Sequence, residues 1–345
     1  MIISVQYLRA LASILVVIVH AFELHRIYFK KSIGISEKIY MFGGIGVDIF
    51  FVISGFIMMY ICSKKPLVSF SQFLKFFENR VIRIAPLYLL ITFFLALSLF
   101  IFPSLFNRTK FDFIHLIYSI FFIPYFNSAE TWHPILAQGW TLTYEFLFYL
   151  LMGISCWLFG KRGVYVCAFF LLINYFFNAS LDYSTSLERI FFEPRLIQFS
   201  FGIFLGALFL SNKILAGVLP NLLVSFLCII LVMYWVINFE LVDDIQRAFL
   251  WGVISFLICY FFISNENFLN KFKSNFFLSL GDSSYSLYLT HNIVLAVAFK
   301  LLVFSKVHLS FYFVIPLVIS LCLFVGHYTY TFIERPITLI FKKKA

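Results

Sequence analysis

Charged side chains are scarce in this sequence. Asp, Glu, Lys and Arg make up 12% of the 345 residues, whereas about one quarter is typical of a soluble domain. Hydrophobic residues make up 62%, and the mean hydropathy is +0.97. This composition argues against a soluble globular protein and in favour of a chain embedded in a lipid bilayer.

Cysteine pairs, repeats and polar linkers are also lacking. The six cysteines stand singly in or at the ends of apolar runs, with no CxxC pair and no Cys/His spacing that would indicate a metal. Isolated cysteines of this kind pack as small hydrophobic side chains. We therefore expect no metal site, one domain over residues 1–345 and no appended extracytoplasmic domain.

Apolar runs long enough to cross a bilayer recur from end to end. A β-barrel would show short alternating segments instead. We therefore predict an all-α polytopic integral membrane protein with about ten transmembrane helices. The expected spans are residues 2–22, 44–62, 84–102, 140–159, 164–178, 195–211, 219–239, 247–264, 281–303 and 310–332.

One further apolar run, 113–126, decides the predicted topology. It contains His115 and Pro124, and it is too short for a comfortable span, so we predict a re-entrant or interfacial helix. With this run excluded, the ten expected spans place both termini on the same side of the membrane.

The distribution of charge supports this topology, because cytoplasmic loops carry an excess of Lys and Arg. With both termini inside, the inner segments hold fifteen of the 26 basic residues and four of the 16 acidic ones. The inner side then carries +11 and the outer side −1, in agreement with the net charge of +10. We predict that both termini are cytoplasmic. We also predict that the positive charge interacts with a lipid bilayer and not with nucleic acid.

Two polar residues of the first span share one face. Arg9 and His20 are eleven residues apart, about three helical turns, which separates them by roughly 16 Å along the axis. Ionisable groups inside a span commonly face a cavity and carry function. The alternative is that Arg9 anchors at the headgroups and His20 lies at the interface.

Polar residues also stand in the second and third spans. Asp48, a turn into the second span, is expected level with His20 if the helices are neighbours, unless it pairs with a lysine of an outer loop. Ser54 is more typical of a helix–helix hydrogen bond than of a nucleophile. Arg80 and Arg83 share a face and suit a phosphate or pyrophosphate, but they are equally typical of cytoplasmic anchoring.

Two later spans start with polar and aromatic side chains. Trp140 and Glu145 open the fourth span, where Glu145 either contacts substrate hydroxyls or is satisfied by Arg or Tyr neighbours. Arg195 opens the sixth span and is either functional or a partner of Glu193.

The ninth span is unusually polar at its start. Tyr288 and His291 lie on one face, with His291 near mid-depth. This places the histidine either in a cavity or as a satisfied core residue. At the end of the last span, Glu334-Arg335-Pro336 is expected to end the helix, because proline terminates helices.

Together these motifs resemble the acyltransferase-3 family of bacterial integral-membrane acyltransferases. The matching pieces occur in the family's order over nearly the whole chain: Arg9-x10-His20, Gly46–Phe56, Arg80-x-x-Arg83, Trp140-x4-Glu145, Ser284–His291 and Glu334-Arg335-Pro336.

The resemblance implies an O-acyltransferase of the bacterial cytoplasmic (inner) membrane. It implies transfer of an acyl group, usually acetyl, from cytoplasmic acetyl-CoA to a hydroxyl of an envelope or extracellular polysaccharide or its lipid-linked precursor. It also implies that His20 is the essential catalytic residue and that Arg9, Arg80 and Arg83 bind the donor. Partners from a polysaccharide-assembly system are expected.

Further residues are expected to take part in catalysis or in substrate binding. Many relatives have two acids where this chain has Glu145 followed by Phe146, and Glu145 is the acid expected to be catalytic. Asp48 is expected to orient His20. Substrate-binding roles are expected for the aromatic, basic and histidine residues near the outer side, namely Trp140, Arg195, Tyr288 and His291.

A secondary transporter or flippase of a polysaccharide precursor is the rival interpretation, because ten spans with buried ions suit a transporter as well. The chain lacks the internal repeat and the paired, Gly/Pro-broken helices that are typical of such transporters.

Overall fold

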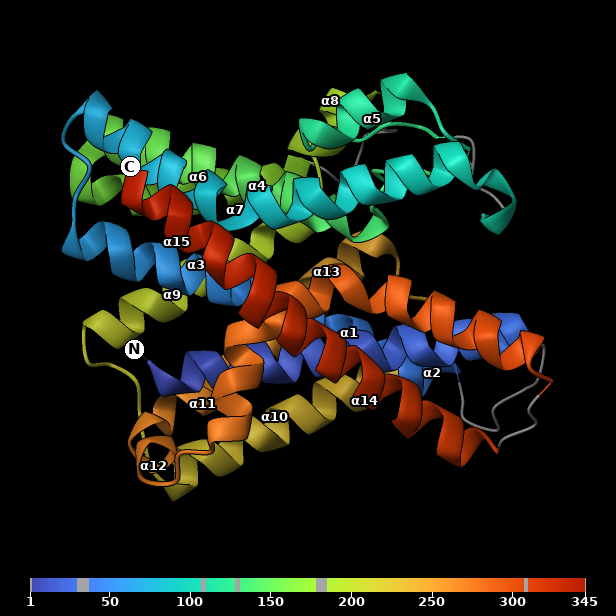
Figure 1. Cartoon of the computed structure of the whole chain (residues 1–345). Helices are drawn as coiled ribbons and strands as arrows, with labels where there is room; N and C mark the ends of the chain where they lie inside the picture. Colours follow the sequence, from blue (N-terminus) through green and yellow to red (C-terminus); the bar gives the residue numbers. More distant parts are fainter. Residues whose placement is uncertain are drawn as a thin grey trace. The chain divides into compact units, whose positions relative to one another are not determined.

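The computed structural model of the protein describes residues 2–29, 37–106, 110–127, 131–177, 185–306 and 310–344. Helices form all the regular structure of these residues, which confirms the all-α class. The long helices are α1 Ile3–Phe29, α3 Ile45–Lys64, α4 Phe70–Ile101, α6 Trp140–Phe159, α7 Gly163–Phe177, α9 Ile197–Leu210, α10 Val218–Ile237, α11 Asp244–Ser264, α13 Asn275–Phe304 and α14 Phe311–Thr329. The short helices are α2 Glu37–Met41, α5 Phe113–Ile120, α8 Ser186–Phe191, α12 Glu266–Lys271 and α15 Arg335–Lys344 (Figure 1).

Within the described residues, nine helical segments are long and apolar enough to cross a membrane. One of them, Ala137–Phe177, consists of α6 and α7 joined by the 3-10 turn Gly160–Arg162. Because α6 and α7 pack against each other across this short turn, they form an antiparallel hairpin and not one long crossing. Each of the expected spans therefore coincides with a helix, although α7 has only 15 residues.

The apolar run at 113–126 does not form a spanning helix, as predicted. Its helical part, α5, has eight residues, which is about 12 Å long. Asp112 caps the start of α5 by accepting a hydrogen bond from the Ile114 amide at 2.8 Å. Residues 121–127 are turn and irregular backbone.

Three helices are clearly longer than the expected spans, because α13 begins at Asn275 and not near residue 281, and the differences are larger for α1 and α4. α1 ends at Phe29 and not near residue 22, and α4 begins at Phe70, where Ser69 caps it, and not near residue 84. Hydropathy locates the apolar part of a helix, while the helical backbone continues through polar residues that lie at or beyond its ends.

The helices group into two compact units. The first unit contains Met1–Ile53 and Phe204–Ile333, and the second contains Ser54–Ile203 and Glu334–Ala345. In the first unit, α1 packs along α13, and both contact α14 (Figure 1).

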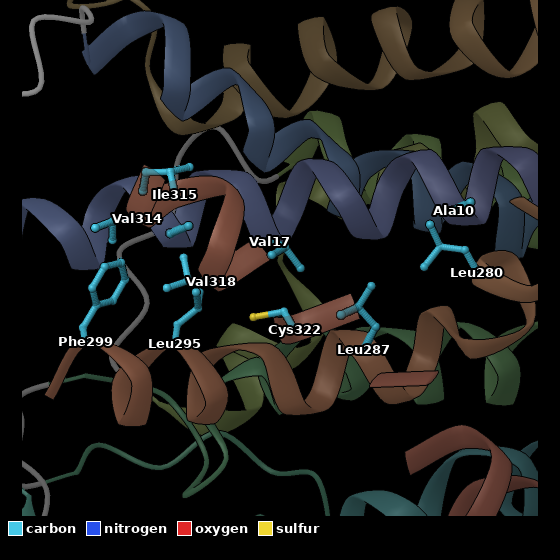
Figure 2. Packing of buried hydrophobic residues seen from close by; sticks show 11 residues of the cluster. Ala10, Val17, Leu280, Leu287, Leu295, Phe299, Val314, Ile315, Val318 and Cys322 are labelled. Carbon is cyan, nitrogen blue, oxygen red and sulfur yellow. The ribbon is translucent and has the colours of Figure 1, made fainter. Parts of the chain in front are cut away.

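The core of the first unit lies between these three helices. Figure 2 shows apolar side chains from α1, α13 and α14 meeting in this core. Its buried members include Ala10, Val17, Leu280, Leu287, Leu295, Phe299, Val314, Ile315, Val318 and Cys322.

Glycines set the register of α3 against α1. A Cβ on Gly46 would lie 2.3 Å from the Ala12 carbonyl oxygen, and one on Gly43 would lie 2.7 Å from that of Leu15. The contact on α1 therefore moves back towards its N-terminus as α3 advances. The two helices run antiparallel, with their backbones in direct contact.

This contact predicts that Gly46→Ala destabilises the protein. The added methyl group would collide with backbone that cannot move independently of α1, and overpacking of this kind costs about 1–3 kcal/mol. The change is measured as a lower melting temperature of the purified protein in detergent. Gly44→Ala is the matched control, because its methyl group would meet only the Trp251 side chain, at 3.2 Å. Equal melting temperatures for the two variants would contradict the prediction.

The second unit is built on α4, α6 and α7, with α5 beside α4. Tyr88 of α4 donates a hydrogen bond to the Ser119 carbonyl of α5 at 2.9 Å. Phe148 of α6 stacks on Phe199 of α9, with ring centroids 4.2 Å apart. The first contact joins α4 to α5, and the second joins the middle of α6 to α9.

The expected end of the last helix at Pro336 is wrong. After α14 the backbone continues through a π-helical turn, Tyr330–Glu334, into α15, whose second residue is Pro336. A π-turn widens the helix locally, which allows the chain to pass a residue without an N–H donor. α15 packs against α4 in the second unit.

Candidate active site

α1 places Arg9 and His20 on one face, as the spacing predicts. The helix is continuous between them, so the separation of roughly 16 Å along the axis is retained. Because α1 extends to Phe29, His20 lies nine residues before its end, about 13 Å along the axis. His20 is therefore further from the end of its helix than the expected span 2–22 implies.

The His20 imidazole is fixed by its own helix. Its Nδ1 lies 2.8 Å from the carbonyl oxygen of Val16. A carbonyl oxygen can only accept a hydrogen bond, so Nδ1 carries the proton and donates it. In the neutral ring Nε2 then carries the lone pair. This is the protonation state that a general base requires.

His291 of α13 lies directly beside His20. The two ring centroids are 4.9 Å apart, and the ring planes are inclined by 66°. His291 is fully buried, and its Nδ1 donates to the Tyr288 carbonyl at 2.6 Å. Its Nε2 is buried without a hydrogen-bond partner. The structure therefore joins two residues that the sequence places in separate motifs.

Tyr288 lies on the same face of α13. Its ring is 5.9 Å from that of His291 and 6.0 Å from that of Phe50 on α3. The expected pair Tyr288 and His291 thus lies beside His20, among side chains of α1, α3 and α13.

Asp48 is buried, but it is not level with His20. Gly46 lies against Ala12, and α3 runs towards the N-terminus of α1 from there. Asp48 is therefore nearer the level of Arg9 than that of His20. The prediction that Asp48 and His20 lie at the same depth was wrong because it assumed that both helices begin at the same level, whereas α1 extends beyond the start of α3.

Glu145 of the second unit has hydrogen-bond donors from the protein. Its Oε1 accepts a hydrogen bond from Ser54 Oγ at 2.9 Å and another from the Tyr149 hydroxyl. This agrees with the interpretation in which neighbours satisfy the lone acid of the span. It also gives Ser54 the helix–helix hydrogen bond that is typical of a serine in a span.

Arg80 lies next to this carboxylate cluster. Its guanidinium carbon is 5.7 Å from the Phe76 ring centroid and 5.9 Å from that of Tyr149. Tyr149 is near the middle of α6, so Arg80 is level with the helix interior and not with its end. Arg83 follows three residues later on α4.

Trp140 and Arg195 form one cluster in the second unit. The Arg195 guanidinium lies 4.4 Å from the Trp140 ring centroid, and its Nε donates to Glu193 at 2.5 Å. The expected partnership of Arg195 with Glu193 is thus present, and the same guanidinium also lies over the Trp140 ring.

Sequence reasoning missed two features of this unit. Tyr149 follows Glu145 by four residues, a spacing that places the two side chains together on a helix and could have revealed the contact. Arg189 lies 4.5 Å over the Trp132 ring, a second Arg–Trp pair, and no local spacing indicates it.

The segment between α4 and α6 is held by a histidine. His115 Nε2 lies 2.9 Å from the His133 carbonyl, which also accepts a hydrogen bond from Asn127 Nδ2 at 3.1 Å. Burial lowers the pKa of His115. The neutral ring with its proton on Nε2 donates this bond, so His115 has a structural role.

Metal ligands do not gather in the ranges that the structure describes, where no group of three His, Cys, Asp or Glu side chains could hold an ion.

The profile of the acyltransferase-3 family, described as an acyltransferase domain, matches residues 2–327. The chain belongs to the acyltransferase-3 family. The exopolysaccharide production protein ExoZ of Rhizobium meliloti (strain 1021) is 28% identical over 270 residues, which cover 75% of this chain and 78% of that protein. No solved structure matches the chain.

The acyltransferase match includes all of the expected site residues. It begins before Arg9 and ends at residue 327, beyond His291 but before Glu334-Arg335-Pro336. An acyltransferase acting on an alcohol needs a base for the hydroxyl and donors for the oxyanion. In the first unit, the neutral ring of His20, whose Nδ1 donates to the Val16 carbonyl, carries its lone pair on Nε2.

Proposed function

We propose that this acyltransferase is an O-acyltransferase that moves an acyl group, most commonly acetyl, from acetyl-CoA to a hydroxyl of an envelope or extracellular polysaccharide or its lipid-linked precursor. The observation that carries the proposal is the imidazole of His20. Its Nδ1–H is bound to the Val16 carbonyl, which leaves Nε2 free to accept a proton inside a membrane helix. Similarity to an exopolysaccharide production protein supports a polysaccharide acceptor.

His20 acts as the general base. Nε2 removes the proton from the acceptor hydroxyl as its oxygen attacks the thioester carbonyl. The tetrahedral intermediate collapses, the carbon–sulfur bond breaks, and the CoA thiolate takes the proton from the imidazolium. The products are the O-acyl ester and free CoA, and His20 returns to its neutral form.

The basic residues hold the donor. Arg80 and Arg83 suit the phosphates of CoA, because guanidinium groups bind phosphate in a bidentate manner. Arg9 is assigned to the same task on the α1 face that carries His20. Asp48 lies nearer the level of Arg9, so we assign it to the donor-binding end of the site. The sequence-based expectation that it orients His20 is not retained.

Other residues support the donor side or bind the acceptor. Glu145 positions Tyr149, whose ring borders Arg80. Trp140 and Arg195 offer an aromatic ring and a cation for a sugar chain. We assign Tyr288 to acceptor binding as well, because its ring lies beside the histidine pair.

We place the enzyme in the bacterial cytoplasmic membrane with both termini in the cytoplasm. The α6–α7 hairpin supports an even number of membrane passes, and the charge distribution favours this orientation. Acyl-CoA is then available on the inner side, and proteins of a polysaccharide-assembly system are the expected partners.

The test compares a deletion strain with its parent. We expect proton NMR of the isolated envelope and extracellular polysaccharides to show loss of O-acyl signals in the deletion strain and their return on complementation. In parallel, membrane vesicles of the deletion strain, which retain unmodified acceptor, receive purified enzyme and radiolabelled acetyl-CoA. Unchanged O-acyl content without incorporation of label would reject the proposal. Solute uptake by reconstituted vesicles would then favour the rival transporter.

A further inference from the structure

The two imidazoles at the centre of the first unit are bound in the same way. His20 donates from Nδ1 to the carbonyl of Val16, and His291 donates from Nδ1 to the carbonyl of Tyr288. Each ring therefore leaves a lone pair at Nε2. Two hydrogen-bond acceptors lie next to each other, with the ring centroids 4.9 Å apart.

The Nε2 atom of His291 has no donor among the described residues. The residue is fully buried, and the rings of His20 and Tyr288 lie beside its own. A buried acceptor without a partner costs about 1–3 kcal/mol. An apolar residue of similar size would avoid this cost, so packing alone does not account for a histidine here.

A ligand with hydroxyl groups supplies the missing hydrogen-bond donor for Nε2 of His291. Sugars carry hydroxyls on neighbouring carbon atoms, and each can donate one hydrogen bond. The hydroxyl that His20 deprotonates occupies one lone pair. The adjacent hydroxyl of the same sugar is then close enough to occupy the other.

We propose that His291 is a positioning residue for the acceptor: its Nε2 accepts a hydrogen bond from the hydroxyl next to the one that His20 deprotonates. The inference rests on the proposed O-acyltransferase function and specifies its acceptor as a sugar with two neighbouring hydroxyls. The bond turns the reacting hydroxyl towards His20. Its loss therefore weakens acceptor use, while binding of the donor is unaffected.

Two substitutions separate this role from a structural one. His291→Asn retains a donor at the position of Nδ1 and removes the acceptor at the position of Nε2. His291→Gln retains an acceptor near the position of Nε2 and removes the Nδ1 donor to Tyr288. If the acceptor bond matters, Gln rescues activity and Asn does not; if His291 only packs against α13, Asn is the better substitute.

The experiment measures incorporation of radiolabelled acetyl into vesicles of the deletion strain, normalised to the amount of folded protein. We expect His291→Asn to lower kcat/KM for the acceptor by about tenfold or more, with an unchanged KM for acetyl-CoA, and His291→Gln to retain most activity. Equal activity of the two variants, or the reverse order, would overturn the inference. Absence of incorporation by the unmodified enzyme would reject the proposed function instead.

A second measurement does not depend on variants. Solid-state NMR of protein labelled with 15N-histidine in nanodiscs reports which ring nitrogen carries the proton. The inference requires a protonated Nδ1 and an unprotonated Nε2 at His291 in the acceptor-free enzyme. A protonated Nε2 would contradict it even if both variants failed to fold.

Discussion

Replacing His20 by Asn is expected to lower acyl transfer by about 100- to 10,000-fold, the usual contribution of a general base. Asn retains a donor at the position of Nδ1, so the hydrogen bond to the Val16 carbonyl can still form. Only the basic lone pair at Nε2 is removed. Incorporation of label from acetyl-CoA into deletion-strain vesicles measures the loss, with the protein level checked by immunoblotting of the membranes.

His25 provides the control for this prediction. It lies five residues further along α1, is buried, and packs against Phe29, Phe299 and Phe311. His25→Asn removes a buried imidazole from the same helix at a site with aromatic neighbours. Its specific activity per folded molecule should stay near that of the unmodified enzyme. A normal rate for His20→Asn, or equal losses in both variants, would show that His20 is not the base.

In the first unit, the sequence predicted the helices and the common face of Arg9 and His20. The spacing of Arg9 and His20 predicts their common face, because any α-helix of that length produces it. The partnership of His20 with His291 could not be predicted, since it depends on which of many apolar helices packs against α1. Hydropathy alone does not distinguish one such helix from another.

The register between neighbouring helices could not be predicted from the sequence either. Asp48 was expected level with His20 because hydropathy places both near the outer ends of their spans. The actual register is set by Gly46, whose missing side chain allows α3 to lie against the Ala12 carbonyl. A glycine in a span predicts close approach, but it does not identify the opposite residue.

In the second unit, the sequence left two alternative environments open for Glu145, and the contacts of its side chain distinguish between them. Glu145 was expected either at a substrate or among satisfied neighbours, and Ser54 and Tyr149 are its donors. The contact with Tyr149 lies within one helix and follows from spacing. The contact with Ser54 joins α3 to α6, so it needed the fold.

Arg80 is expected to tolerate Lys far less well than Arg83 does. The Arg80 guanidinium lies over the rings of Phe76 and Tyr149, whereas no cation–π contact of Arg83 occurs in the described part of the chain. A planar guanidinium can stack and bind phosphate in a bidentate manner, and an ammonium group cannot do both. Arg80→Lys should therefore raise the KM for acetyl-CoA by about tenfold, and Arg83→Lys should raise it by less.

The KM comparison also tests what Arg80 does. A donor-binding residue changes KM and leaves kcat nearly unchanged, because donor binding is recovered at high acetyl-CoA. Tyr149→Phe is the matched control for its surroundings: it retains the ring beside Arg80 and removes only the hydroxyl that binds Glu145. If Arg80→Lys lowers kcat at an unchanged KM, Arg80 does not hold the donor. If Tyr149→Phe raises KM as much as Arg80→Lys, the carboxylate cluster and not the stacked guanidinium determines donor binding.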